Sequence, residues 1–402
     1  MSTKRWSLAL AGAALSLSVA ACGTPGQAGG GGGEGDGGAD GPHKVGLVYS
    51  KSGPLAPYGA QYKAAFEVGL DFATDGTGEV GGQKIEITEK DDAGDPAKAV
   101  SAVTDLIGQD NEIIAGSTAS GVALQVAPLA QDNKTLFISG PAAADAVTGA
   151  NDYTFRSGRQ TYQDVATAGT MLGDVKGKRV TVLAQDSAFG TANIDAVKSV
   201  LGTKGAKVTA IEAPAGAKDF TPYATKIKSQ KPDLLFVAWA GDNATSMWGT
   251  LSQQGVFDTT KVVTGLDIKA THALFGEAGT KIDFLSHFFA GAADNEAYTA
   301  LEEGLKEDGE EVDLFSTDGF VAAQMVVRAL EEGDGDVDKM VSSLEGWKFE
   351  GPKGQMEIRP EDHAMLQPMF TVSLKKEGKQ FVPELGETID AADVAPPVAT
   401  KK

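Results

Sequence analysis

Cysteine and histidine are both scarce in this sequence, with one cysteine and four histidines among 402 residues. A single cysteine cannot form a disulfide framework within the chain. The histidines, His43, His272, His287 and His363, are scattered, and no two of them have the spacing of a metal site. The sequence also lacks a Gly-x-Ser-x-Gly nucleophile elbow. We therefore expect neither an enzyme nor a bound metal or other cofactor.

Long apolar runs are also missing, because no stretch reaches the roughly 20 residues that span a bilayer. The chain begins instead with Lys4 and Arg5, a mostly apolar stretch over residues 6–19, and small residues before Cys22. This order predicts a secretory signal peptide over residues 1–21. Its end resembles a lipobox, at which bacterial lipoproteins are acylated on the cysteine and cleaved. An ordinary signal peptide with a stray cysteine is the alternative.

A lipid anchor at Cys22 would hold the protein at the extracytoplasmic face of the cell membrane. Positive charge is in the minority, with 35 Lys and Arg against 55 Asp and Glu and a formal net charge of −20. Such a surface repels nucleic acid and anionic lipid headgroups. Neither is therefore an expected partner.

Glycine is plentiful, but its strings lack the context of a nucleotide site. Residues 33–38 and 76–81 both match the Gly-x-Gly-x-x-Gly pattern. That pattern holds a pyrophosphate only between a strand and the helix that follows it. The first string lies in a glycine-rich linker, and the second follows a predicted helix and precedes a predicted strand. We therefore do not expect nucleotide binding.

Two segments of biased composition flank the central part of the chain. Residues 22–43 are dominated by glycine and offer almost nothing apolar to bury, which predicts a flexible linker. Its root-mean-square reach is about 25 Å. Residues 391–402 are rich in alanine and proline and predict a disordered tail.

Strand and helix patterns alternate between these segments. Residues 45–139 and residues 160–264 each contain short apolar strands separated by helical stripes. Asp95-Pro96 and Thr221-Pro222 are typical of a helix start, with an N-cap residue before a proline. Such alternation predicts parallel sheets with helices on both faces, and two successive runs predict two sheets. The elements that complete them are helices near 295–305, 316–330 and 337–344 and strands near 355–358 and 369–374.

Four motifs occur in a characteristic order: residues 52–59 (SGPLAPYG), 91–100 (DDAGDPAKAV), 118–123 (TASGVA) and 138–143 (ISGPAA). The series resembles the leucine/isoleucine/valine-binding proteins of bacterial ABC importers, a group with the type I periplasmic-binding-protein fold. The resemblance runs from about Lys44 to Leu385. It implies an α/β fold of two Rossmann-like lobes with a ligand cleft between them.

The resemblance also implies where the chain passes between the lobes. Crossings are expected near residues 156–160, 288–291 and 347–351. The expected lobes are then 44–157 plus 290–349 for the first, and 158–289 plus 350–390 for the second.

Site residues of the first lobe follow from the resemblance. Ser120 aligns with the serine that binds the ligand's carboxylate, at a strand–loop–helix unit where a helix N-terminus also favours an anion. A simple helix cap is its alternative role. Pro141, Ala142 and Ala143 fall on the loop that holds the polar end of an amino acid, although Ala143 replaces a threonine. Tyr58 aligns with an aromatic residue that lines this lobe.

Three residues are implied for the second lobe. Phe189 stands where the family has a tyrosine, so a hydroxyl is missing. Trp239 ends an apolar strand and would cover the apolar part of a ligand, with plain core packing as its alternative role. Asp267 aligns with a glutamate that pairs with the ligand's ammonium group. An exposed, helix-capping aspartate is the alternative there.

Together these features predict a monomeric substrate-binding lipoprotein of an ABC importer. It would bind a branched-chain or other hydrophobic amino acid by hinge closure and deliver it to a membrane permease. Because two of the family's hydroxyls are absent, an aromatic acid or a short amide is the alternative ligand. A lipoprotein that feeds a membrane sensor is the alternative function.

Overall fold

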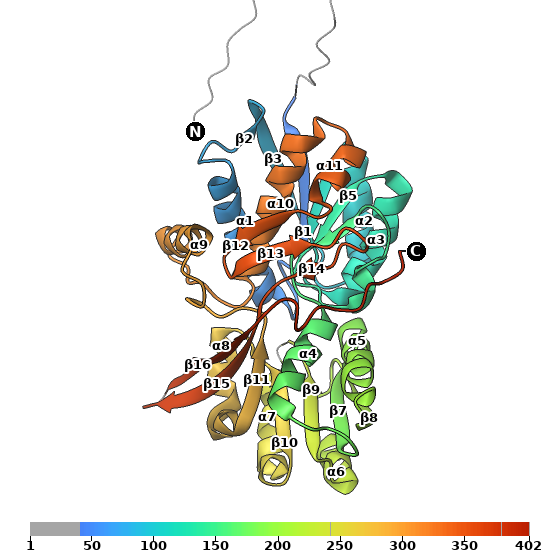
Figure 1. Cartoon of the computed structure of the whole chain (residues 1–402), viewed down its shortest axis with the longest axis vertical. Coiled ribbons are helices and arrows are strands. Elements are labelled where there is room, and N and C mark those ends of the chain that lie inside the picture. Colours follow the sequence, from blue (N-terminus) through green and yellow to red (C-terminus); the bar gives the residue numbers. More distant parts are fainter. Residues whose placement is uncertain (1–40, 242, 379, 402) are drawn as a thin grey trace, which may run out of the picture. The chain divides into compact units, whose positions relative to one another are not determined.

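Two parallel-rich sheets, each with helices on both faces, form the core of the chain (Figure 1). The structure is a computed structural model that describes residues 41–401 except Asp242 and Lys379. The predicted signal peptide, Cys22 and most of the predicted linker lie outside these residues. The α/β class with two Rossmann-like lobes is confirmed.

The first sheet has the strand order β2-β3-β1-β4-β5-β6, in which only the β2–β3 pair is antiparallel. Its strands are β1 (His43–Tyr49), β2 (Glu79–Val80), β3 (Gln83–Asp91), β4 (Ile113–Gly116), β5 (Leu136–Ser139) and β6 (Thr154–Arg156). The helices that surround it are α1 (Ala56–Ala73), α2 (Pro96–Ile107), α3 (Ser120–Asn133), α10 (Ser316–Gly333) and α11 (Val337–Leu344), with α9 (Glu296–Glu307) packed on α1. We call this assembly the first lobe.

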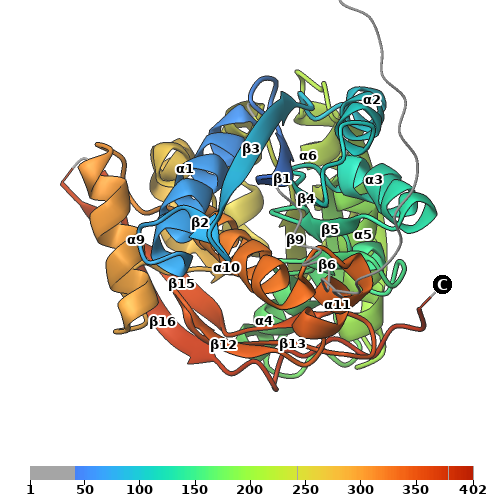
Figure 2. The ribbon, with the colours of Figure 1, turned by 90° about the horizontal axis from the view of Figure 1, so that it is seen from above.

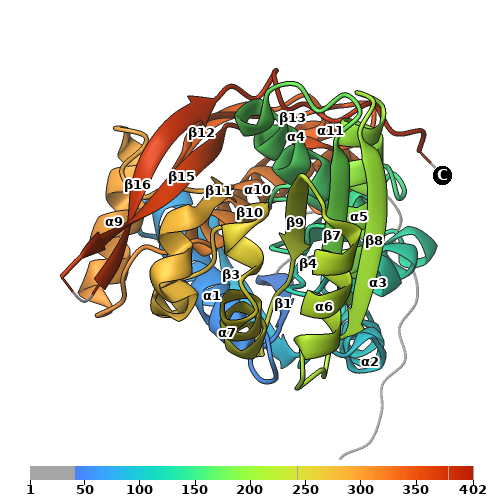
Figure 3. The same cartoon turned by 90° about the horizontal axis from the view of Figure 1, so that it is seen from below.

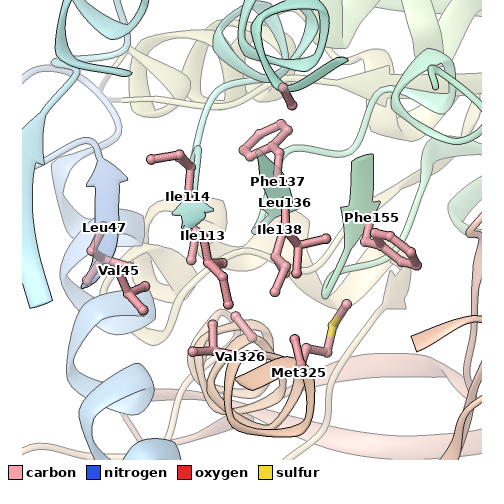
Figure 4. Packing of buried hydrophobic residues seen from close by; sticks show 14 of the residues in the cluster. Val45, Leu47, Ile113, Ile114, Leu136, Phe137, Ile138, Phe155, Met325 and Val326 are labelled. Atoms are coloured by element: carbon pink, nitrogen blue, oxygen red, sulfur yellow. The ribbon is translucent and has the colours of Figure 1, made fainter. Parts of the chain in front are cut away.

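Apolar side chains alternate between the two faces of this sheet, as its buried strands require. Ile113 and Ile138 point toward Met325 and Val326 of α10 (Figure 4). Their neighbours in sequence point to the other face, which α2 and α3 cover (Figure 2). The predicted helix start at Asp95 is confirmed, because its carboxylate accepts hydrogen bonds from the first-turn N–H groups of α2.

The second sheet has the order β16-β15-β11-β10-β9-β7-β8. Its strands are β7 (Arg179–Asp186), β8 (Lys207–Pro214), β9 (Leu234–Ala238), β10 (Lys261–Gly265), β11 (Ile282–Ser286), β15 (Met369–Glu377) and β16 (Gln380–Ile389). The helices around it are α4 (Thr161–Leu172), α5 (Ala188–Val197), α6 (Thr221–Gln230), α7 (Ala244–Gln253) and the short α8 (Lys269–His272). We call this assembly the second lobe.

Helices α4 and α5 cover one face of the second sheet, and α6 and α7 cover the other (Figure 3). The predicted N-cap at Thr221 is wrong: Phe220 is the capping residue, and Thr221 is already helical. Among the described residues, none of the helices has both the length and the apolar character needed to cross a bilayer.

Residues 350–366 differ from the expected lobe assignment. The three short strands β12 (Lys348–Gly351), β13 (Gly354–Ile358) and β14 (Met365–Leu366) form a small antiparallel sheet. Its buried residues Phe349, Met356 and Ile358 join the core of the first lobe. The chain therefore enters the second lobe only after β14, and not near residues 347–351, because these apolar side chains belong to the first-lobe core and β12 packs against α10.

The segment 391–402, expected to be a disordered tail, packs on the protein over its described part. Val394 is fully buried. Arg359 of the first lobe donates a hydrogen bond to a backbone carbonyl of this segment, and Lys401 forms an ion pair with Asp152. The prediction of disorder from composition is wrong for the described part, because the buried Val394 and the contacts of Arg359 and Lys401 hold the segment on the protein.

Candidate functional site

The carboxyl ends of the strands in both sheets face a common cavity of about 380 Å³, which we call the main cavity. This is the edge at which open α/β sheets bind ligands. Side chains of both lobes line it, and Arg159 is the one charged residue among the described residues that do so. The lining residues used below are Tyr58, Ser120, Pro141, Ala143, Arg159, Phe189 and Phe315.

A second, smaller cavity of about 70 Å³, the inner cavity, lies beside the ends of β9, β10 and β11. Tyr58, Arg159, Phe189 and Phe315 line both cavities. Asp267 and Trp239 line the inner cavity, and so do the buried residues Asp164 and His287. A ligand that fills the main cavity therefore lies next to the acidic groups of the inner one.

Ser120 is the first residue of α3 and does not act as its cap, because the N-cap residue is Ala119, which has no capping side chain. The Ser120 hydroxyl oxygen instead accepts the Ala144 N–H at 3.2 Å. The hydroxyl proton has no acceptor among the described residues. The N–H groups that open a helix have no acceptor within it. This corner of the main cavity thus offers hydrogen-bond donors and the positive end of a helix dipole.

The strand that leads to Ser120 ends in unusual backbone. Gly116 has φ = +120°, and a Cβ there would lie 2.0 Å from the carbonyl oxygen of Val48. Ser117 follows with φ = +72°, which a residue other than glycine adopts at a cost. The turn places the start of α3 directly over the end of β4. The sequence folds this way because only glycine fits so close to β1.

Pro141 and Ala143 line the main cavity, whereas Ala142 is buried in the core of the first lobe. The carbonyl oxygens of this loop are all held by donors from the first crossing between the lobes or from the start of α4. They are paired as Pro141 with Arg159 Nη1 (2.9 Å), Ala142 with Arg156 Nη2 (2.7 Å), Ala143 with Thr161 N (2.8 Å) and Ala144 with Arg156 Nη1 (3.3 Å). The loop therefore offers the cavity no free acceptor among these four.

Tyr58 and Asp267 meet across the lobes. The Tyr58 hydroxyl donates to Asp267 Oδ1 at 2.8 Å, and the same oxygen accepts the Ile268 N–H. Asp267 is not the exposed helix cap that was the alternative, because Ile268 precedes α8 as its N-cap. Burial raises the pKa of the Asp267 carboxyl above its usual value.

The two aromatic residues predicted for the second lobe lie differently. Phe189, in the first turn of α5, lines both cavities. Trp239 lines only the inner one, donates from Nε1 to Asn243 Oδ1 at 2.9 Å, and packs edge-on against Phe220 at 5.1 Å between ring centroids. Trp239 is thus a core residue with one side toward the inner cavity.

Arg159 and Phe315 line both cavities but were not predicted from the sequence, and Arg159 is the charged one of the two. The residue is only 9% exposed. Its Nε lies 3.3 Å from Asp164 Oδ2, and its guanidinium stacks 6.0 Å from the ring centre of Phe315. Arg159 lies in the predicted first crossing, and the signal that was available was a second arginine three residues after Arg156. Its position over the main cavity makes it the natural partner for an anion.

Comparison with known proteins assigns the chain to a family. The family model described as periplasmic binding protein matches residues 42–379, so the chain belongs to the periplasmic-binding-protein family. Members of this family are substrate-binding proteins rather than enzymes, and they work outside the cytoplasm. The family therefore gives the class of this chain, which is a solute-binding protein.

Among curated relatives, the Leu/Ile/Val-binding protein BraC3 of Rhizobium johnstonii is 31% identical over 195 residues, which is 48% of this chain and 53% of the relative. A Leu/Ile/Val-binding protein homologue of Brucella abortus is 24% identical over 77% of this chain and 82% of its own length. The chain thus spans about half the length of the first of these relatives.

Solved structures agree on the fold. The crystal structure of an ABC-type branched-chain amino acid transporter from Rhodopseudomonas palustris is 29% identical, with a TM-score of 0.75 over 90% of this chain and all of that one. A solute-binding protein of an ABC transporter from R. palustris, in complex with 4-hydroxybenzoate, is 23% identical, with a TM-score of 0.79 over 87% of this chain and 98% of that one.

Proposed function

We propose that this protein is the lipid-anchored binding component of an ABC importer and that it delivers a small carboxylate with an apolar body to a membrane permease. The single observation that supports the ligand class is the chemistry of the main cavity. Arg159 and the Ser120 hydroxyl, together with the helix N-terminus at α3, are donors for an anion, while Tyr58, Phe189 and Phe315 are aromatic walls.

A branched-chain or other hydrophobic amino acid is the first candidate ligand. Asp267 borders the inner cavity and can pair with an ammonium group, for which it would exchange its hydrogen bond from Tyr58. The relatives BraC3 and the R. palustris transporter carry names that refer to branched-chain amino acids. A volume of about 380 Å³ is in the range of small-molecule sites.

An aromatic acid is the second candidate, and one specific observation favours it. Two acceptors that could bind an ammonium group are already engaged, since Asp267 accepts from Tyr58 and the Pro141 carbonyl accepts from Arg159. A carboxylate without an ammonium group would leave both of these bonds in place. The missing hydroxyls at Ala143 and Phe189 also make the cavity less polar.

Binding would couple to closure of the lobes. Ser120 and Pro141 belong to the first lobe and Phe189 to the second, so a ligand that touches all three stabilises the closed arrangement.

Acylation at Cys22 would keep the protein near its permease. Substitution Cys22→Ser should move the protein from the membrane fraction to the soluble extracytoplasmic fraction, and unchanged fractionation would contradict the anchor.

A thermal-shift screen of the mature protein tests the ligand class. The panel contains leucine, isoleucine, valine and phenylalanine, then 4-methylpentanoate and benzoate, and the primary amides of the last two. A ligand at 100 times its dissociation constant adds about 2.7 kcal/mol to the free energy of unfolding. We expect the acids to raise the melting temperature more than their amides. If no carboxylate in the panel does so, the proposed ligand class is wrong.

A further inference from the structure

Arg156 is fully buried and makes five hydrogen bonds, although it lines neither cavity. It ends β6, the last strand of the first sheet, at the point where the chain leaves for the second lobe. Its acceptors are Gly158 O, Arg159 O, Ala142 O, Ala144 O and Thr148 Oγ1. Burial lowers its pKa to about 10, so the guanidinium stays charged at neutral pH.

The shortest of these bonds is to the carbonyl oxygen of Ala142, at 2.7 Å from Nη2. That carbonyl belongs to the same peptide group as the N–H of Ala143. In a trans peptide the C=O and N–H bonds point in opposite directions. Holding the Ala142 oxygen therefore fixes the Ala143 N–H on the side away from the guanidinium.

The Ala143 N–H has no hydrogen-bond partner among the described residues, although Ala143 is only 2% exposed. A buried N–H without an acceptor is uncommon and costly. Ala143 lines the main cavity, where a ligand atom can supply the missing acceptor. The N–H groups on either side are already used, by Ser117 O for Ala142 and by Ser120 Oγ for Ala144.

A charge-assisted bond to one end of a peptide also strengthens the donor at its other end, because hydrogen bonds in series polarise one another. We propose that Arg156 is a positioning residue that aims and polarises the Ala143 N–H as a donor to the carboxylate of the ligand, without touching the ligand itself. This inference rests on the proposed function, because it requires a carboxylate ligand.

The proposed role predicts different effects on the affinity for a carboxylic acid and on the affinity for its primary amide. A carboxylate oxygen gains most from a strengthened donor, whereas a neutral amide gains less. Lysine keeps the positive charge at position 156 but cannot hold two carbonyls with a planar fork. Arg156→Lys should therefore weaken an acid about tenfold and its primary amide about twofold at most. A purely structural role for Arg156 would weaken both by the same factor.

The experiment uses the mature protein and whichever acid most raises the melting temperature of the wild type, together with its primary amide, by titration calorimetry. Arg359→Lys is the matched control: Arg359 is another partly buried first-lobe arginine, bound to Asp362 and to a backbone carbonyl far along the chain from the cleft loops. It should lower stability and leave the acid-to-amide affinity ratio unchanged.

The outcomes are distinct. If the wild type binds no carboxylate, the proposed function falls, and this inference falls with it. If the wild type binds the acid and Arg156→Lys keeps the wild-type acid-to-amide ratio, only this inference is overturned. Should Arg156→Lys not fold, the amide resonance of Ala143 in the isotope-labelled wild type decides. A downfield shift with the acid and a clearly smaller one with the amide supports the Ala143 N–H as the donor that the inference requires, and equal or absent shifts overturn the inference.

Discussion

The two lobes contribute different kinds of residues to the lining of the main cavity. The first-lobe side combines backbone and small residues held in place by buried arginines, the Ser120 hydroxyl at a helix start, and the aromatic rings of Tyr58 and Phe315. The second-lobe side contributes Phe189 from the first turn of α5. We therefore expect the first lobe to recognise the polar end of a ligand and the second lobe to help cover its apolar body, together with Tyr58 and Phe315.

Arg159, which lies between the two sides, should have the largest effect. Arg159→Gln removes the only charged group that lines the main cavity among the described residues, and hydrogen bonds to charged groups contribute about 1.5–3 kcal/mol. We expect acid affinity to fall about a hundredfold by calorimetry, with little change for the amide. Arg179→Gln, at an exposed ion pair with Asp233, is the control and should change neither. If the affinity for the acid falls by less than threefold, Arg159 does not bind the ligand's carboxylate.

A matched pair of substitutions tests the division between lobes directly. Ser120→Ala removes a donor from the first-lobe side and should weaken an acid about tenfold more than its amide. Phe189→Ala removes an aromatic wall from the second-lobe side and should weaken acid and amide by the same factor, again about tenfold. Equal behaviour of the two variants in an acid-and-amide titration would show that the division of roles is mistaken.

The smallest expected effect is a pH dependence that involves Asp267. Burial raises the pKa of this carboxyl, so it takes up a proton at a pH above the ordinary value for aspartate. Pairing with an ammonium group needs the ionised form. The affinity for an amino acid should therefore be constant above the raised pKa and fall as the pH drops through it.

Asp267→Asn provides the control for that titration. The variant should bind leucine weakly at every pH and 4-methylpentanoate as the wild type does. If the affinity for leucine depends on pH in the same way in both proteins, Asp267 does not pair with the ammonium group. An aromatic acid would then be the favoured ligand.

Much of the fold could be predicted because strand and helix periodicities are local. The helix start at Asp95 and the alternating strands of both sheets follow from a few adjacent residues. The lobe assignment of residues 350–366 could not be predicted in this way. Phe349 and Met356 carry the same apolar pattern whichever lobe they pack on, and only the position of α10 decides between the lobes.

The candidate site was partly predictable for the same reason. Ser120, Pro141 and Ala143 sit on loops that follow strands, where the motif order already suggested a cleft, and all three line the main cavity. For Arg156 and Arg159 the available signal was only a pair of arginines three residues apart, which does not indicate what either side chain contacts. Their roles depend on a crossing that brings the end of β6 beneath the loop after β5, which is a property of the sheet and not of neighbouring residues.

The ordered segment after β16 has a mechanical consequence. Lys401 forms ion pairs with Asp152 and Glu345, both in the first lobe, and the described chain also enters that lobe at β1. Within the described residues, the second lobe thus lies between two segments that are attached to the first. A pulling force applied through Gly41 and Lys401 would first load contacts of the first lobe, including the ion pairs of Lys401.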